Sequence, residues 1–177
     1  MSILAEITNR IQEGRLQELL PALPSQRLVR RMIVSPDIAA LVLGPWTEPD
    51  WEERCNYLRA DLDRFISGQT IPVTAGKLND RHSYLKQLIP AAGEIWEIRS
   101  RDPDPSLRVM GRFAAVDVFV ALAWYKRASL GGPSSRPWRD ATVQCATDWR
   151  NLFPAYEPIH ADTSNGFNDY VSNCFPV

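Results

Sequence analysis

The residues best suited to chemistry in this chain are arginines spaced along segments in which apolar and polar residues alternate. Arg108 and Arg112 stand four apart in LRVMGRF, where the odd-numbered positions are apolar or glycine. Because side chains alternate across a β-strand, we expect both arginines on one, solvent-facing side of a strand. Arg99 ends the preceding β-rich segment, and Lys126 and Arg127 follow the next one. Such a face can hold phosphate groups through charge-assisted hydrogen bonds, although arginine also serves simply as a polar surface residue.

The charge of the chain is unevenly distributed. Its formal net charge is −1 over 177 residues, so no field of the whole molecule would attract nucleic acid or a membrane. From Arg99 to Arg139 eight basic residues accompany three acids, whereas from Asp140 onward five acids accompany only Arg150. This asymmetry indicates either an anionic partner for the basic segment or internal ion pairs between the two segments.

Aromatic residues and histidines supply the remaining candidates. Trp96, Phe119 and Tyr125 accompany the arginines and could stack nucleic-acid bases. His160 lies in a proline-containing tail, where functional groups often concentrate, and it is a candidate acid–base group. His82 lies among polar residues at an expected helix start, which is typical of a surface or capping residue.

Several other kinds of site have no counterpart in the sequence. It has no GxGxxG or GxxxxGK[ST] nucleotide-binding loop and no GxSxG or HExxH motif. Its three cysteines form no CxxC pair, and with two histidines they give no metal-ligand spacing, so we expect no metal and no cofactor. The absence of a secretory signal and of an apolar run of about 20 residues favours a cytoplasmic protein without a membrane span.

Helical periodicity dominates both ends of the chain. Apolar residues at spacings of three and four predict helices over 2–20, 25–34 and 36–43, followed by the clearest helix, from Thr47 to Gly68. Shorter signals predict helices over 80–88 and 135–152, before an irregular tail that Tyr170, Val171 and Phe175 could hold to the body.

The period changes from 3.6 to 2 in the middle of the chain. Residues 95–99, 107–113 and 116–125 are predicted as three strands of an antiparallel meander. A two-residue turn would set Arg112 opposite Asp117, whereas a four-residue turn would set Phe113 opposite Val118. Both registers place the following residues on one face: Leu107, Val109, Phe113, Val118, Val120 and Leu122.

Segregated helices and strands indicate an α+β fold. We expect N-terminal helices, a three-stranded antiparallel meander, a C-terminal helix and an irregular tail. The corresponding segments are an N-terminal helical segment (1–45), an α+β core with the antiparallel sheet (46–153) and a tail (154–177) packed on that core.

The layout resembles the bacterial RelE/ParE toxin superfamily, including its HigB-like and phage-derived members. The matching segments are IWEIR at 95–99, LRVMGRF at 107–113 and an apolar strand that runs into the basic pair at 126–127. The resemblance covers about residues 47–153. The chain is longer than a typical toxin of this family, and its slight negative charge differs from the usual basic balance.

The resemblance implies a protein that binds or cleaves RNA, on the ribosome, through a basic sheet face and is neutralised by an antitoxin-like partner. It implies a metal-independent ribonuclease whose late acid–base group has two candidates, His160 and Tyr170. The resemblance matches its basic positions to Arg99, Arg108 and Lys126, and extends to Arg112. Combined with the residue pattern above, the candidate catalytic residues are Arg99, Arg108, Arg112 and His160, and the candidate substrate-binding residues are Lys126, Arg127, Trp96 and Tyr125.

A second class of function stays open. Six tryptophans, two of them in the Pro45–Trp46 and Pro137–Trp138 turns, are typical of a protein interface. The alternative is therefore a non-enzymatic interaction or assembly protein of phage or mobile-element origin. A homodimer is compatible with either function.

Overall fold

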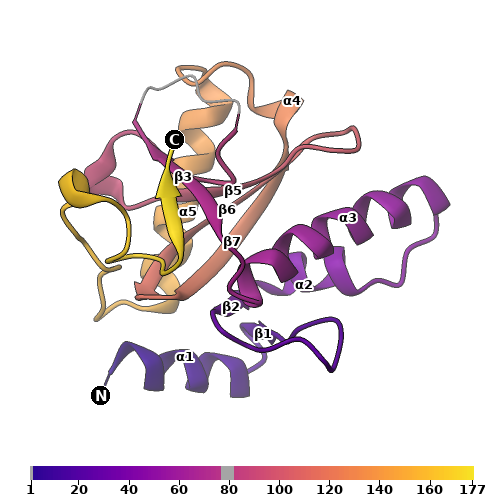
Figure 1. The fold of residues 1–177 in the computed structure, drawn as a ribbon, viewed down its shortest axis with the longest axis horizontal. Coiled ribbons are helices and arrows are strands. Elements are labelled where there is room, and N and C mark those ends of the chain that lie inside the picture. The colour runs from indigo at the N-terminus through magenta and orange to yellow at the C-terminus, as the bar shows by residue number, and fades with distance from the viewer. Residues whose placement is uncertain (1, 77–81) are drawn as a thin grey trace.

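A mixed sheet forms the centre of the molecule (Figure 1). The computed structural model describes residues 2–76 and 82–177, and within them the sheet has eight strands in the order β1-β2-β7-β6-β5-β4-β3-β8. The pairs β2–β7, β3–β4 and β3–β8 are parallel, and the other neighbouring pairs are antiparallel. The last residues of the chain therefore return to the sheet as an edge strand.

The elements follow one another along the chain with strands and helices interspersed. The strands are β1 (Gln17–Leu19), β2 (Arg31–Val34), β3 (Ile71–Ala75), β4 (Leu85–Gln87), β5 (Trp96–Ser100), β6 (Leu107–Ala115), β7 (Val118–Lys126) and β8 (Cys174–Pro176). The helices are α1 (Ile3–Gln12), α2 (Pro36–Leu43), α3 (Pro49–Ile66), α4 (Arg127–Leu130) and α5 (Arg136–Leu152), with 3-10 turns η1 (Ala91–Gly93) and η2 (Thr163–Asn165).

The predicted three-stranded antiparallel sheet is wrong, although the fold is α+β. Strands β5, β6 and β7 do form an antiparallel meander, but β4 extends it on one side and β2 on the other. The additional strands are only three to five residues long. Such short segments contain too few residues for an alternating pattern to distinguish them from loops or helices.

The helices predicted over 36–43, from Thr47 to Gly68 and over 135–152 are confirmed as α2, α3 and α5, and α3 forms without a side-chain cap. Ser2, Ser35 and Ser135 each accept a hydrogen bond from a backbone N–H in the first turn of α1, α2 and α5. By contrast, β1 and β2 lie where helices over 2–20 and 25–34 were expected. Strand β2 is buried on both faces and so lacks the alternation of a half-buried strand. Strand β4 replaces part of the helix expected over 80–88, of which residues 80 and 81 lie outside the described residues.

Helices cover both faces of the sheet. On one side, here called the α3 face, Phe65 of α3 packs on Phe113 and on Phe119, with ring centroids 6.4 Å and 6.0 Å apart. On the other side, the α5 face, Trp149 of α5 and Ile7 of α1 belong to a second core. Figure 1 shows α5 passing behind the strands, with α2 and α3 to one side. The sheet thus separates two apolar layers.

The pairing of β6 with β7 differs from both predicted registers. A two-residue turn at Val116–Asp117 sets Ala115 opposite Val118. The pairing then has two register shifts, one between Phe113 and Ala115 and the other between Met110 and Gly111. Each shift displaces the alternation by one residue, so side chains expected on one face are divided between two. Leu107, Val109 and Phe113 lie on the α3 face, whereas Val118, Val120 and Leu122 lie on the α5 face.

Arg30 holds the C-terminal tail against the body. Its side chain is fully buried and donates hydrogen bonds to carbonyl groups of α3, of the loop after it and of the tail. Its Nε lies 3.5 Å from a carboxylate oxygen of Asp117, and burial lowers its pKa. Of the residues expected to hold the tail, Tyr170 and Val171 are buried, and Phe175 is exposed.

Candidate functional site

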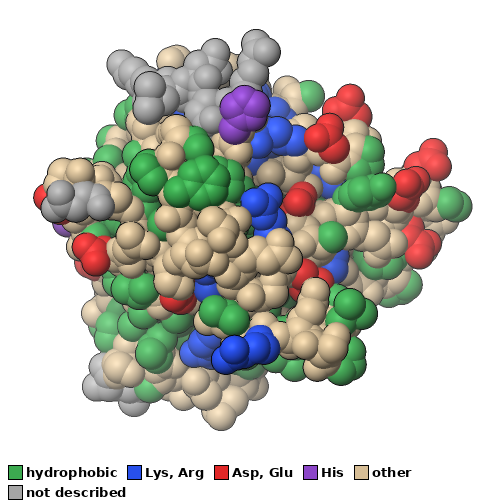
Figure 2. Space-filling view, in the orientation of Figure 1, with side chains coloured by type: hydrophobic (Ala, Val, Ile, Leu, Met, Phe, Trp, Pro, Cys, Tyr) green, Lys and Arg blue, Asp and Glu red, His purple; other side chains and the backbone are tan. Residues whose placement is uncertain are grey.

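The side chains predicted to form one basic site are divided among separate places. The α5 face of β5 and β6 was expected to meet water, but α5 packs against β6 and β7, and Arg108 and Arg112 are each only 7% exposed. On the face that Figure 2 shows, basic side chains form small separate groups, and acidic ones gather where α3 begins. The prediction of an open arginine face is therefore wrong.

Two of the predicted substrate-binding residues lie on the α3 face. Trp96 is fully buried, with its ring 4.7 Å from that of Tyr170, so no base can stack on it in this structure. Lys126 is exposed and lies 5.2 Å from the ring centroid of Trp51. The other two, Tyr125 and Arg127, are half-buried near Arg108.

Glu94 is a buried carboxylate that sequence reasoning missed as a site residue. It follows η1 directly and has a left-handed backbone conformation, with φ of 47°. Its Oε1 contacts Nδ1 of His160, and its Oε2 accepts hydrogen bonds from the Tyr170 hydroxyl at 2.7 Å and from Gln87 Nε2 at 3.1 Å. Both oxygens of the carboxylate therefore have partners, and the side chain is only 5% exposed.

His160 presents the other side of its ring to solvent. Its side chain is 76% exposed, and the Glu94 carboxylate on Nδ1 fixes the orientation of the imidazole. A carboxylate at this position favours the tautomer with the proton on Nδ1, which leaves Nε2 as a proton acceptor. A buried carboxylate behind an exposed imidazole is the arrangement of a general base.

Tyr170 fixes the position of Glu94. Its hydroxyl accepts a hydrogen bond from the backbone N–H of Ala161 at 2.8 Å and donates to Glu94. Burial raises the pKa of Tyr170 to about 12, so the phenol keeps its proton at neutral pH. The two late candidates, His160 and Tyr170, therefore meet on one carboxylate.

Arg112 brings a positive charge next to this group. Its Nη2 donates to the Gly93 carbonyl, and its guanidinium lies 5.8 Å from the centroid of the Trp149 ring. Burial lowers the pKa of Arg112, and the charge of Glu94 opposes that change. Of the predicted catalytic residues, Arg112 and His160 are the two that lie beside Glu94.

Arg99 and Arg108 belong to a different group, which surrounds the buried Glu97. They face each other across β5 and β6. Glu97 Oε1 lies 2.7 Å from Arg99 Nε, and Oε2 lies 3.5 Å from Arg108 Nε. Burial lowers the pKa of Arg108 to about 10, and Glu97 partly opposes the change. This group can attract anions, but it contains no exposed acid–base side chain like His160.

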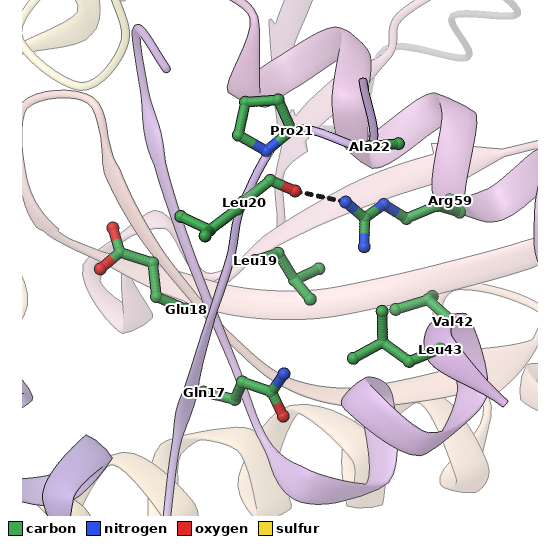
Figure 3. Close-up of a pocket in the computed structure, with 9 residues that line it drawn as sticks. All are labelled: Gln17, Glu18, Leu19, Leu20, Pro21, Ala22, Val42, Leu43 and Arg59. Atoms are coloured by element: carbon green, nitrogen blue, oxygen red, sulfur yellow. Dashed lines mark hydrogen bonds between the residues drawn. The ribbon is translucent and has the colours of Figure 1, made fainter. Parts of the chain in front are cut away.

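A hollow beside the edge strand β1 is the third surface feature (Figure 3). It has a volume of about 480 Å³, and Arg59 at its rim donates to the Leu20 carbonyl. Leu20 and Leu43 are 62% and 47% exposed. Among the described residues β1 pairs only with β2, so its other edge is open. Apolar walls beside an open strand edge suit a protein contact better than catalysis.

Comparisons with protein-family models, with curated proteins and with solved structures found no match to this chain. In residues 2–76 and 82–177, no three His, Cys, Asp or Glu side chains are grouped so that they could hold a metal ion. None of the helices in that same part of the chain combines the length and the apolar character needed to cross a bilayer. The geometry around Glu94 therefore carries the functional argument.

Proposed function

We propose that this protein is a RelE/ParE-like toxin that cleaves RNA without a metal ion and uses His160 as its general base. One observation carries the proposal: an imidazole 76% exposed is held at Nδ1 by a carboxylate 5% exposed. The segments that resemble the family, at 95–99, 107–113 and 126–127, fall on β5, on β6 and where β7 meets α4, within an eight-stranded mixed sheet.

The reaction follows from what RNA itself supplies. His160 Nε2 removes the proton of a ribose 2′-hydroxyl, and the oxygen attacks the adjacent phosphorus. The bond from phosphorus to the 5′ oxygen breaks, and that oxygen takes a proton from solvent. The products are a 2′,3′-cyclic phosphate and a 5′-hydroxyl. Glu94 stabilises the imidazolium formed in the first step, as a buried carboxylate does when it is hydrogen-bonded to a catalytic histidine.

In this proposal Arg112 acts on the reacting phosphate through the electrostatic field of its positive charge. Its guanidinium is bound to the Gly93 carbonyl and is 7% exposed, so it does not itself touch the substrate. A fixed positive charge beside the reacting phosphate favours the extra negative charge of the transition state. Arg112 is therefore a positioning and electrostatic residue for Glu94 and His160.

Induced expression tests the proposal in cells. We expect wild-type protein to arrest growth and fragment messenger RNA, and Glu94→Gln to lose most of both effects because the amide has no negative charge to stabilise the imidazolium. Asp169→Asn is the matched control, since Asp169 is an exposed acid of the same tail. Unchanged growth and intact RNA with the wild-type protein would rule the toxin function out.

The hollow beside β1 favours a second candidate, a non-enzymatic interaction protein that pairs through this edge. For this function we expect a stable oligomer in size-exclusion chromatography with light scattering, which Leu20→Asp disrupts. Val143→Asp is the control, because Val143 is similarly exposed, at 63%, but lies on α5. A wild-type monomer over a wide concentration range would count against self-association through β1.

A further inference from the structure

The loop between β4 and β5 brings Glu94 back to the end of β4. The backbone N–H of Leu88 donates to the Ile95 carbonyl at 2.8 Å, and in the next pair Gln87 stands opposite Trp96. Gln87 is the last residue of β4 and is 2% exposed. The base of this hairpin therefore holds the Gln87 amide next to the Glu94 carboxylate, where its Nε2 donates to Oε2 at 3.1 Å.

The Tyr170 hydroxyl contacts both sides of the pair that Glu94 and His160 form. It donates to Oε2 of Glu94 at 2.7 Å, and it accepts from the backbone N–H of Ala161 at 2.8 Å. Ala161 follows His160 directly, and its carbonyl oxygen lies 3.2 Å from the same hydroxyl. Tyr170 is fully buried, and its ring lies 4.7 Å from that of Trp96. The core thus fixes where the hydroxyl lies, and with it the place of the carboxylate relative to the histidine backbone.

Both donors end on the same oxygen of Glu94. A carboxylate turns about its last bond with little preference, so either oxygen could otherwise face the imidazole. Because Gln87 and Tyr170 both bind Oε2, Oε1 is the oxygen that faces Nδ1. The amide of Gln87 is neutral, so it orients the carboxylate without cancelling its charge, as a lysine would.

We propose that Gln87 and Tyr170 are positioning residues for the Glu94 carboxylate. They hold it in the orientation that keeps the proton of His160 on Nδ1 and leaves Nε2 as the proton acceptor. Their side chains are 2% and 0% exposed, so they act through Glu94 and do not touch a substrate. Their effect on catalysis, unlike the orientation itself, rests on the proposed function.

NMR of the imidazole nitrogens tests the positioning without any RNA. Long-range proton–nitrogen spectra of the full chain are recorded at about pH 9, where an ordinary histidine is neutral. We expect His160 of the wild type to carry its proton on Nδ1. In Gln87→Met and in Tyr170→Phe the share of this tautomer should fall by at least about half, because a carboxylate free to turn no longer selects between the two ring nitrogens.

Tyr84→Phe is the matched control for the loss of a buried hydroxyl. Tyr84 is 3% exposed, and its hydroxyl donates to the Asp61 carbonyl at 2.7 Å, outside the group around Glu94. We expect the wild-type tautomer in this variant. Tyr170→Phe keeps the buried ring, so it carries the test if Gln87→Met does not fold. An unchanged tautomer in a folded Gln87→Met or Tyr170→Phe, or an equal change in Tyr84→Phe, overturns the assignment.

Cleavage kinetics distinguish a failure of the positioning from a failure of the proposed function. We expect Gln87→Met to lower kcat by about 10–10²-fold and to leave KM within about twofold, because a misplaced base slows the chemical step and not binding. In a Glu94→Gln background the same replacement should have no further effect. A further loss there would contradict an action through Glu94. A wild type that cleaves no RNA but keeps the proton of His160 on Nδ1 would refute the ribonuclease and support the positioning.

Discussion

Replacing His160 with alanine is expected to lower the rate of RNA cleavage by about 10²–10⁴-fold, the range that general acid–base catalysis contributes. The side chain is 76% exposed and packs in no core, but its removal takes a hydrogen-bond partner from the buried Glu94 carboxylate, so we expect the free energy of unfolding to fall by about 1–3 kcal/mol. The initial rate of cleavage of a labelled RNA, measured beside a urea unfolding curve, separates lost chemistry from lost folding.

The other histidine of the chain provides the matched control. His82 lies outside the group around Glu94, so His82→Ala is expected to cleave RNA at the wild-type rate. A wild-type rate in His160→Ala would contradict the assignment of His160 as the general base. Equal losses in both variants would indicate a general role of histidine charge in RNA binding.

Replacing Gly111 with alanine is expected to destabilise the fold by about 3 kcal/mol or more. A Cβ at this position would lie 2.1 Å from the Val120 carbonyl oxygen and 2.9 Å from the Cα atom of Ala121. Both atoms belong to the backbone of β7, so no side-chain rotation relieves the overlap. Unfolding in urea, with the free energy extrapolated to water, measures the loss.

Gly132 provides the comparison, because a Cβ there would meet no atom within 4 Å. Gly132→Ala is expected to leave stability unchanged or to raise it by about 0.4–1 kcal/mol, through the smaller entropy of the unfolded chain. A fully stable Gly111→Ala would mean that β6 and β7 do not approach as closely as the register shift at Gly111 requires.

The helices were predictable where local chemistry decides the structure. A serine before an apolar stripe marks α1, α2 and α5, because the hydroxyl satisfies an N–H that the helix cannot. Strand β2 was not predictable in this way. Its consecutive Met32, Ile33 and Val34 are buried against both layers, and only the neighbouring β7 makes this segment a strand.

The members of the candidate site were partly predictable, but their grouping was not. His160 and Arg112 are the residue types that acid–base and phosphate chemistry require. Glu94 carries no local signal, because its contact with His160 joins residues 66 apart in the chain. The burial of Arg108 was also invisible in the local pattern, since it depends on helix α5 returning over the sheet.

The most direct test of the central claim is the chemistry of the RNA ends that purified protein produces in the presence of EDTA. The proposed reaction predicts 2′,3′-cyclic phosphate and 5′-hydroxyl ends with the wild-type protein, and intact RNA with His160→Ala. Intact RNA with the wild-type protein, or fragments ending in a 3′-hydroxyl and a 5′-phosphate, would contradict it.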